Sequence, residues 1–114
     1  DETAFKKMKD GVIIVNTARG LIIDTQALIA SLKNGKVGFA ALDTFEGEVG
    51  LYYLNKETQR LDNDNMALLK SFPNVILSPH MAFYTEQAVS DMVENSIKGI
   101  LGLESGEDNR LAVK

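Results

Sequence analysis

Three reactive side chains each follow a short apolar run of this sequence. The apolar runs cover residues 12–15, 39–42 and 75–77. Arg19, Glu48 and His80 come after the first, second and third run, and open α/β sheets present their chemistry at the ends of such buried strands. A guanidinium can hold an anion, and an imidazole beside a carboxylate can move a proton. Together these groups predict a site suited to reducing a small anionic substrate such as a 2-keto acid.

Composition narrows the class of protein. The 114 residues are 45% hydrophobic and 25% charged, which is typical of one soluble globular domain or part of one. A net charge of -4 argues against a nucleic-acid partner. The absence of cysteine excludes disulfides and thiolate metal sites, and it fits a cytoplasmic protein without a metal. No apolar run approaches the roughly 20 residues that span a membrane, and a start at Asp1 without methionine predicts a fragment.

The hydrophobic pattern predicts helices alternating with short strands. Helices are expected over residues 1–9, 25–34, 66–71 and 86–103, and strands over residues 12–15, 37–42 and 74–77. Asp24 or Thr25 would cap the second helix and Thr85 the last one, whereas residues 46–65 form a long polar loop. The order favours an α/β fold with a parallel sheet. Strands that are apolar on both faces suit a sheet covered by helices on each side.

The last predicted helix is amphipathic. Its apolar stripe consists of Ala88, Met92, Val93, Ile97, Ile100 and Leu101. Three strands make only half of a doubly wound domain, so the remaining half is expected elsewhere. The predicted architecture is the second half of a Rossmann-like doubly wound sheet, followed by a long helix.

Three motifs carry a resemblance to a known family. The segments are Val-Asn-Thr-Ala-Arg-Gly at 15–20 followed by Asp24, Ala-Leu-Asp-Thr-Phe-Glu-Gly-Glu at 41–48, and Ser-Pro-His at 78–80. In this order they resemble the signatures of the D-isomer-specific 2-hydroxyacid dehydrogenases, over nearly the whole chain. The segment at 80–87 is most similar to the D-lactate dehydrogenase branch, including the vancomycin-resistance type. It reads His-Met-Ala-Phe-Tyr-Thr-Glu-Gln. Formate dehydrogenases carry glutamine where this chain has Glu48.

The resemblance also implies what the chain lacks. The family holds the dinucleotide's pyrophosphate on a Gly-x-Gly-x-x-Gly turn, and this sequence has no such motif. Residues 1–82 would therefore be the C-terminal half of the NAD-binding domain. Residues 83–114 would be the connecting helix and the C-terminal segment of the substrate domain. The complete enzyme is expected to be a homodimer, and the 114 residues alone are expected to be inactive.

The resemblance assigns a role to each member of the triad. Arg19 would bind the substrate carboxylate through its planar fork, and His80 would give a proton to the developing alkoxide. Glu48 would hold the imidazole in one orientation and favour its protonated form. From the residues alone, Glu46 is an alternative to Glu48; the family spacing from Asp43 selects Glu48.

Other residues are expected around the cofactor and the substrate. Thr17, Ala18, Arg19, Asp43 and His80 would line the nicotinamide of NAD. Asp43 could instead cap the loop that follows it, and Asn16 would brace the Arg19 loop through backbone hydrogen bonds. Phe83 and Tyr84 would wall the substrate pocket, with core packing as the alternative. Their bulk would favour a small substituent such as the methyl of pyruvate.

The expected function is NADH-dependent reduction of a 2-keto acid, with pyruvate first, to the D-2-hydroxy acid. Two alternatives remain open. Similar domains serve as NAD-sensing, corepressor-like binding modules without catalysis, and the chain could also be an inactive half-domain. An assay with pyruvate and NADH on the full-length protein would separate the enzyme from the binding module.

Overall fold

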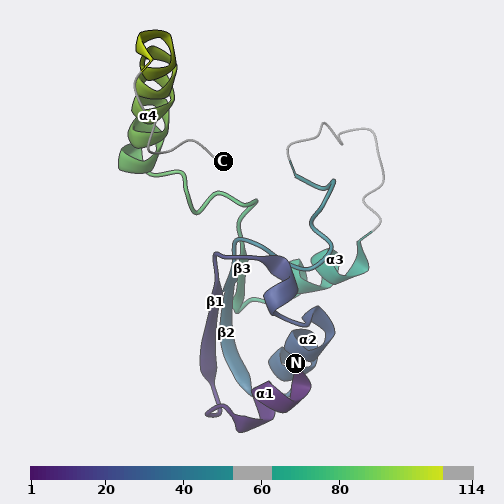
Figure 1. Ribbon diagram of the computed structural model, residues 1–114. Helices are drawn as coiled ribbons and strands as arrows, with labels where there is room; N and C mark the ends of the chain where they lie inside the picture. Colours follow the sequence, from purple (N-terminus) through teal and green to yellow (C-terminus); the bar gives the residue numbers. More distant parts are fainter. Residues whose placement is uncertain (53–62, 107–114) are drawn as a thin grey trace. The chain divides into compact units, whose positions relative to one another are not determined.

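A computed structural model describes residues 1–52 and 63–106 of the chain, which divides into two compact units (Figure 1). The first unit covers residues 1–82 and the second begins at Phe83. The elements of the first unit are α1 (Glu2–Lys7), β1 (Val12–Asn16), the 3₁₀ turn η1 (Gly20–Ile22), α2 (Thr25–Lys33), β2 (Val37–Leu42), α3 (Asp64–Ser71) and β3 (Val75–Leu77). The second unit contains α4 (Glu86–Ser105). The middle of the predicted 46–65 loop and the tail from residue 107 lie outside the described residues.

The sheet of the first unit is parallel, with strand order β1-β2-β3. Asn16 at the end of β1 pairs with Leu42 at the end of β2, and Leu42 pairs with Leu77 at the end of β3. The three strands therefore finish level, and the segments that follow them leave from one edge. We call this edge the carboxyl rim and define it as residues 16–20, 43–48 and 78–82. The predicted parallel sheet and α/β fold are confirmed.

Side-chain caps set where the helices begin. Asp24 accepts a hydrogen bond from the Ala27 amide at 2.9 Å, so it, rather than Thr25, caps α2. Asn63 accepts from the Met66 amide at 2.8 Å and starts α3 at Asp64, two residues before the predicted start. These oxygens satisfy amides that have no partner within the helix.

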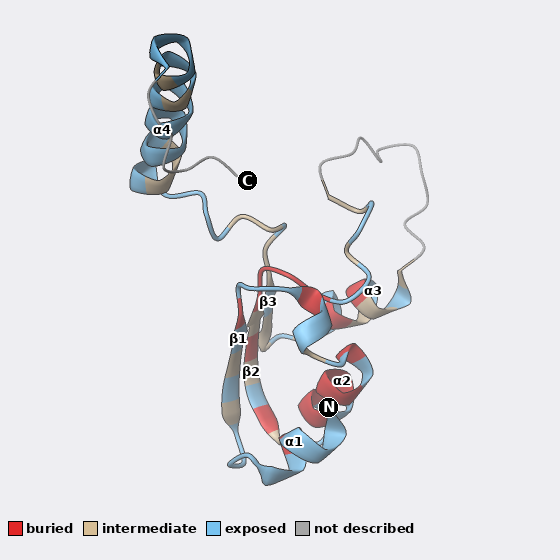
Figure 2. Ribbon diagram, viewed as in Figure 1, coloured by how far each residue is buried: buried red, intermediate tan, exposed pale blue. Residues whose placement is uncertain are grey.

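The core lies on one face of the sheet, where α1, α2 and α3 pack (Figure 2). Its buried apolar members are Phe5, Ala27, Leu28, Ile29, Leu32, Val37, Ala40, Leu42 and Leu69. On the other face Ile13 and Val15 are each 66% exposed and Ile76 is 56% exposed. We expected helices to cover both faces of the sheet. Within the described residues they cover only one face, because all three helices of the first unit pack against it.

Helix α4 begins where the sequence predicts. The Thr85 hydroxyl accepts from the Ala88 amide at 3.2 Å, and Gly106, with a φ of 73°, ends the helix. None of its residues is buried, so the predicted apolar stripe faces no core in the part of the chain that the structure describes. No helix in that part is long and apolar enough to cross a bilayer.

Candidate active site

The carboxyl rim brings together an acid and an imidazole from different loops. Nδ1 of His80 lies 3.5 Å from Oε1 of Glu48, an ion-pair distance when the ring is protonated. The Glu48 side chain is 15% exposed, whereas that of His80 is 37% exposed. Glu46 points elsewhere, since its Oε2 accepts a hydrogen bond from the Thr25 amide at 3.3 Å. The residues alone left open whether Glu46 or Glu48 pairs with His80. In the structure the partner is Glu48.

The backbone around Glu48 holds its carboxylate in place. The second carboxylate oxygen, Oε2, accepts from the Phe45 amide at 3.1 Å. The Glu48 amide in turn donates to the Phe45 carbonyl at 3.3 Å, and the Leu51 amide donates to the Glu48 carbonyl at 3.0 Å. Gly47 and Gly50 take left-handed φ values of 83° and 81°, which glycine adopts without steric cost. The carboxylate is thereby oriented before any ligand arrives.

Tyr52 is a neighbour of this pair that sequence reasoning missed. Its ring packs edge-on against buried Phe45, with centroids 6.1 Å apart. Burial raises the pKa of Tyr52, and the nearby carboxylates of Glu48 and Asp43 raise it further. No sequence pattern marks Tyr52, because its position depends on how the loop after β2 folds back.

Asp43 fastens the loop that carries His80. Its buried carboxylate accepts the Ser78 hydroxyl at 2.6 Å, the Met81 amide at 2.7 Å and the Ala82 amide at 2.9 Å. The His80 amide also donates to the Asp43 carbonyl at 2.9 Å. His80 adopts a φ of 56°, a left-handed conformation that persists in a non-glycine residue only where surrounding contacts hold it.

This arrangement bears on the predicted role of Asp43. The carboxylate oxygens of Asp43 accept hydrogen bonds from the 78–82 segment, which begins 35 residues further along the chain. These bonds do not go to the loop directly after β2. The nicotinamide contact stays a prediction.

The charge of Asp43 is favoured by its surroundings. Burial by itself raises the pKa of Asp43, but hydrogen bonds from Ser78, Ala82 and Met81 and the charge of His80 outweigh burial. The pKa of Asp43 therefore lies below its usual value. A carboxyl group with a depressed folded-state pKa stabilises the fold above its unfolded pKa, and this contribution is lost as pH falls through the folded pKa.

We expect Asp43→Asn to lower the free energy of unfolding at neutral pH by about 1–3 kcal/mol, because an amide cannot accept all three bonds. Below about pH 4 the wild type should lose the Asp43 contribution, so the difference between the two proteins should shrink. Urea unfolding across pH measures this. Asp64→Asn, at an exposed position of α3, is the matched control. A difference that is constant with pH would contradict this role for Asp43.

Arg19 follows β1 at the same rim. Its side chain is exposed, and Nη1 donates to the Ala18 carbonyl at 2.7 Å. Within the described residues the guanidinium forms no ion pair with Glu48. The structure thus brings His80 and Glu48 together. In the described part of the chain, no carboxylate of the carboxyl rim forms an ion pair with Arg19.

The Arg19 loop touches the Glu48 loop backbone to backbone. A Cβ placed on Gly20 would lie 2.2 Å from the carbonyl carbon and oxygen of Phe45, closer than real contacts allow. Only a residue without a side chain fits there. This approach links the segment after β1 to the segment after β2.

Gly20→Ala should therefore lower the free energy of unfolding by about 1–3 kcal/mol, as overpacking against backbone does. Equilibrium urea unfolding measures the change. The control is Gly102→Ala in α4, where a Cβ would meet no atom within 4 Å and where alanine favours the helix. Equal stability of the two variants would show that the close approach is wrong.

Two small side chains follow β1 at the carboxyl rim. Thr17 and Ala18 are both exposed there. All four α-helices of the described chain have N-termini capped by their own side chains, from Asp1, Asp24, Asn63 and Thr85. Each of these side chains bonds one amide of the first turn. The predicted contacts of Thr17 and Ala18 with the nicotinamide stay predictions.

Phe83 and Tyr84 belong to the second unit. Their rings pack edge-on, with centroids 6.1 Å apart, and both are exposed. Tyr84 also lines a hollow at the start of α4, together with Thr85, Glu86, Val89 and Ser90. Their predicted role as walls of a substrate pocket stays a prediction.

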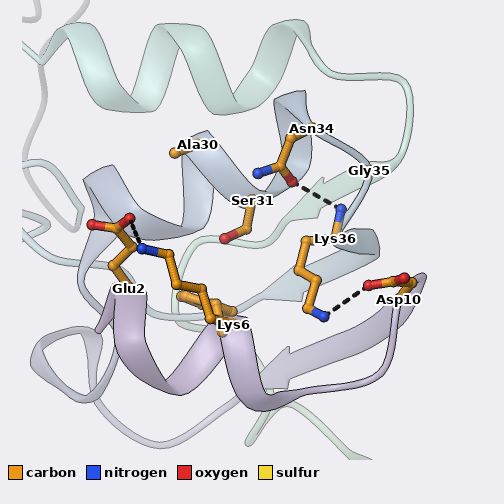
Figure 3. A pocket seen from close by; sticks show the side chains of 9 residues that line it. Glu2, Lys6, Asp10, Ala30, Ser31, Asn34, Gly35 and Lys36 are labelled. Carbon is orange, nitrogen blue, oxygen red and sulfur yellow. Dashed lines mark hydrogen bonds and ion pairs between the residues drawn. The ribbon is translucent and has the colours of Figure 1, made fainter.

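A cavity of about 540 Å³ lies at the opposite edge of the sheet, between α1, α2 and the turn before β2 (Figure 3). Its lysines are already paired, Lys6 with Glu2 and Lys36 with Asp10, each at 2.7 Å. The basic and acidic side chains of the cavity therefore compensate one another in pairs. Across residues 1–52 and 63–106, no group of three or more His, Asp or Glu side chains could hold a metal ion.

Known proteins share this fold and are similar to this chain in sequence. The chain is 51% identical over 98 residues to an aromatic 2-oxoacid reductase of Clostridium sporogenes, covering 86% of this chain and 30% of that protein. A D-lactate dehydrogenase of Treponema pallidum superposes with a TM-score of 0.91 at 38% identity, covering 100% of this chain and 34% of that one. A D-lactate dehydrogenase of Lactobacillus jensenii, solved with NAD+, superposes with a TM-score of 0.88 at 32% identity. The match covers 99% of this chain and 34% of that one.

The chain thus spans about a third of the length of these relatives. Residues 1–82 match the family described as the D-isomer specific 2-hydroxyacid dehydrogenase, NAD binding domain. NAD is accordingly the cofactor of this domain family. With the parallel sheet and the three motifs at its rim, the chain belongs to the D-isomer specific 2-hydroxyacid dehydrogenases.

Proposed function

We propose that this chain, as part of a longer protein, reduces a 2-oxo acid to the D-2-hydroxy acid with NADH. The observation that carries the proposal is the Glu48–His80 pair, held at the carboxyl rim beside Arg19 in a chain of this family. An acid-oriented imidazole and an unpaired guanidinium are the groups that such a reduction requires from the protein.

Each residue has a defined task. NAD, held along Thr17, Ala18 and Asp43, would supply hydride chemistry at the carbonyl carbon when bound. Arg19 binds the substrate carboxylate through two parallel hydrogen bonds and so fixes the orientation of the carbonyl. His80 donates a proton to the carbonyl oxygen as it becomes a hydroxyl. Because Nδ1 faces Glu48, Nε2 is the atom that gives the proton, and Glu48 holds the ring in that orientation.

Pyruvate is the proposed substrate. Phe83 and Tyr84 are bulky residues that would favour a methyl substituent, and the similar T. pallidum and L. jensenii proteins are D-lactate dehydrogenases. The C. sporogenes relative reduces aromatic 2-oxoacids, so phenylpyruvate is the informative competitor. A higher kcat/KM for pyruvate supports this assignment, whereas a higher value for phenylpyruvate places the substrate in the aromatic class.

The decisive experiment uses the full-length protein that carries this chain. NADH oxidation is followed with pyruvate, and the product is separated on a chiral column. Formation of D-lactate supports the proposal. Tight NADH binding without turnover of any 2-oxo acid would favour the NAD-sensing binding module.

The remaining assignments follow from the same proposal. Residues 1–82 are assigned to the C-terminal half of the NAD-binding domain. Residues 83–114 are assigned to the connecting helix and the end of the substrate domain. We further propose a cytoplasmic homodimer as the complete enzyme. Sedimentation of the full-length protein tests the dimer.

The isolated 114 residues should oxidise no NADH with pyruvate and should bind NADH weakly. The reason is that this sequence carries no Gly-x-Gly-x-x-Gly turn to hold the pyrophosphate. Fluorescence titration and a turnover assay measure both quantities, with the full-length protein as control. Turnover by the isolated chain would overturn the half-domain assignment.

A further inference from the structure

Asn16, the last residue of β1, is a buried polar side chain that touches two loops. It is 6% exposed, although it stands at the open edge of the sheet. Its Oδ1 accepts from the Ala18 amide at 3.1 Å, which confirms the predicted bracing of the Arg19 loop. Its Nδ2 donates to the Arg19 carbonyl at 2.9 Å and, at a longer 3.4 Å, to the Thr44 carbonyl.

The Thr44 contact reaches beyond the residue's own loop. Thr44 is fully buried and lies directly between Asp43, which fastens the His80 loop, and Phe45, whose amide binds Glu48. Asn16 therefore joins the backbone of Arg19 to the segment that orients the acid and the imidazole. Gly20 packs against the same segment on the other side of Arg19.

Among the residues that the structure describes, the Arg19 side chain makes only a local hydrogen bond, to the Ala18 carbonyl. Its guanidinium can serve the same substrate as His80 only if the backbone that carries it is fixed relative to the second loop. A displacement of about 1 Å in such a group is enough to lose much of the benefit of orientation.

We propose that Asn16 is a positioning residue: its carboxamide fastens the Arg19 loop to the Glu48 loop and so sets the guanidinium in register with the Glu48–His80 pair. The inference rests on the proposed function, because it concerns how Arg19 meets the carboxylate of a 2-oxo acid. Asn16 touches no reacting atom and acts through Arg19.

Asn16→Asp in the full-length protein tests the inference. The variant is the same size and keeps the acceptor for Ala18, but it loses both donated hydrogen bonds. We expect the KM for pyruvate and the Ki for oxamate, an unreactive carboxylate analogue, to rise roughly tenfold. NADH affinity should stay near wild type. Asn74→Asp is the matched control, since Asn74 Nδ2 donates to the Gly38 carbonyl at 2.9 Å at the opposite end of the strands.

A double-mutant cycle separates positioning from general damage. In an Arg19→Ala background, Asn16→Asp should cause no further loss of oxamate affinity, because the residue acts through the guanidinium. If Asn16→Asp does not fold, Asn16→Ser, which adds no charge, carries the same expectation. Equal loss in both backgrounds, wild-type values for Asn16→Asp, or failure of both variants to fold would overturn the proposal. If the wild type itself reduces no 2-oxo acid, the proposed function fails instead.

Discussion

His80→Ala is expected to lower kcat for the 2-oxo acid by a factor of roughly 10²–10⁴, the usual contribution of a general acid. The ring is the proton donor of the proposed reaction, and no other imidazole exists in this chain to replace it. Stopped-flow and steady-state kinetics on the full-length protein measure the loss. KM for the substrate should change far less than kcat, since Arg19 still binds the carboxylate.

Two controls make this result interpretable. His80→Ala should retain the unfolding midpoint of the wild type, because the ring is partly exposed and its loop is also held by Asp43. Glu48→Gln should reduce kcat less than His80→Ala does, since it leaves the donor in place and removes only its charged partner. A kcat for His80→Ala near that of wild type would refute the assignment of the proton donor.

Arg19→Ala is expected to lower kcat/KM for the 2-oxo acid by roughly 10²-fold, mainly through a higher KM. A bidentate, charge-assisted contact to the substrate carboxylate is lost, and with it the orientation of the carbonyl toward the nicotinamide. Steady-state kinetics and oxamate inhibition measure the effect. Folding should be unaffected, because the guanidinium is exposed and, over residues 1–52 and 63–106, bonds only to the neighbouring Ala18 carbonyl.

Arg19→Lys provides the sharper comparison. Lysine keeps the charge but offers a point-like ammonium in place of a planar fork, so it should recover part of the binding and less of the turnover. Full recovery by lysine would mean that charge alone matters. Unchanged kinetics in Arg19→Ala would remove Arg19 from the site.

Local patterns predicted the elements of this fold well. The second strand is found at its predicted bounds, 37–42, and α4 starts after Thr85 as expected. These features depend on neighbours in sequence: apolar runs, caps and glycine stops. The short η1 turn, which begins at Gly20, was not predicted. Gly20 packs against the backbone of Phe45, and this contact between distant segments leaves no local sequence pattern. The uncovered face around Ile13 was not predicted either, because covering a face depends on packing partners.

The amino-acid pattern alone established the parallel α/β sheet, the family and the three side chains proposed for chemistry, since strand ends and motif order can be read from neighbouring residues. Long-range contacts settled the rest. In the tertiary structure Glu48, and not Glu46, lies beside His80. Asp43 accepts a hydrogen bond from Ser78, 35 residues away, and Asn16 contacts two loops. Such contacts depend on where the chain returns to the rim, and that path is set by the packing of the whole sheet rather than by any local run of residues.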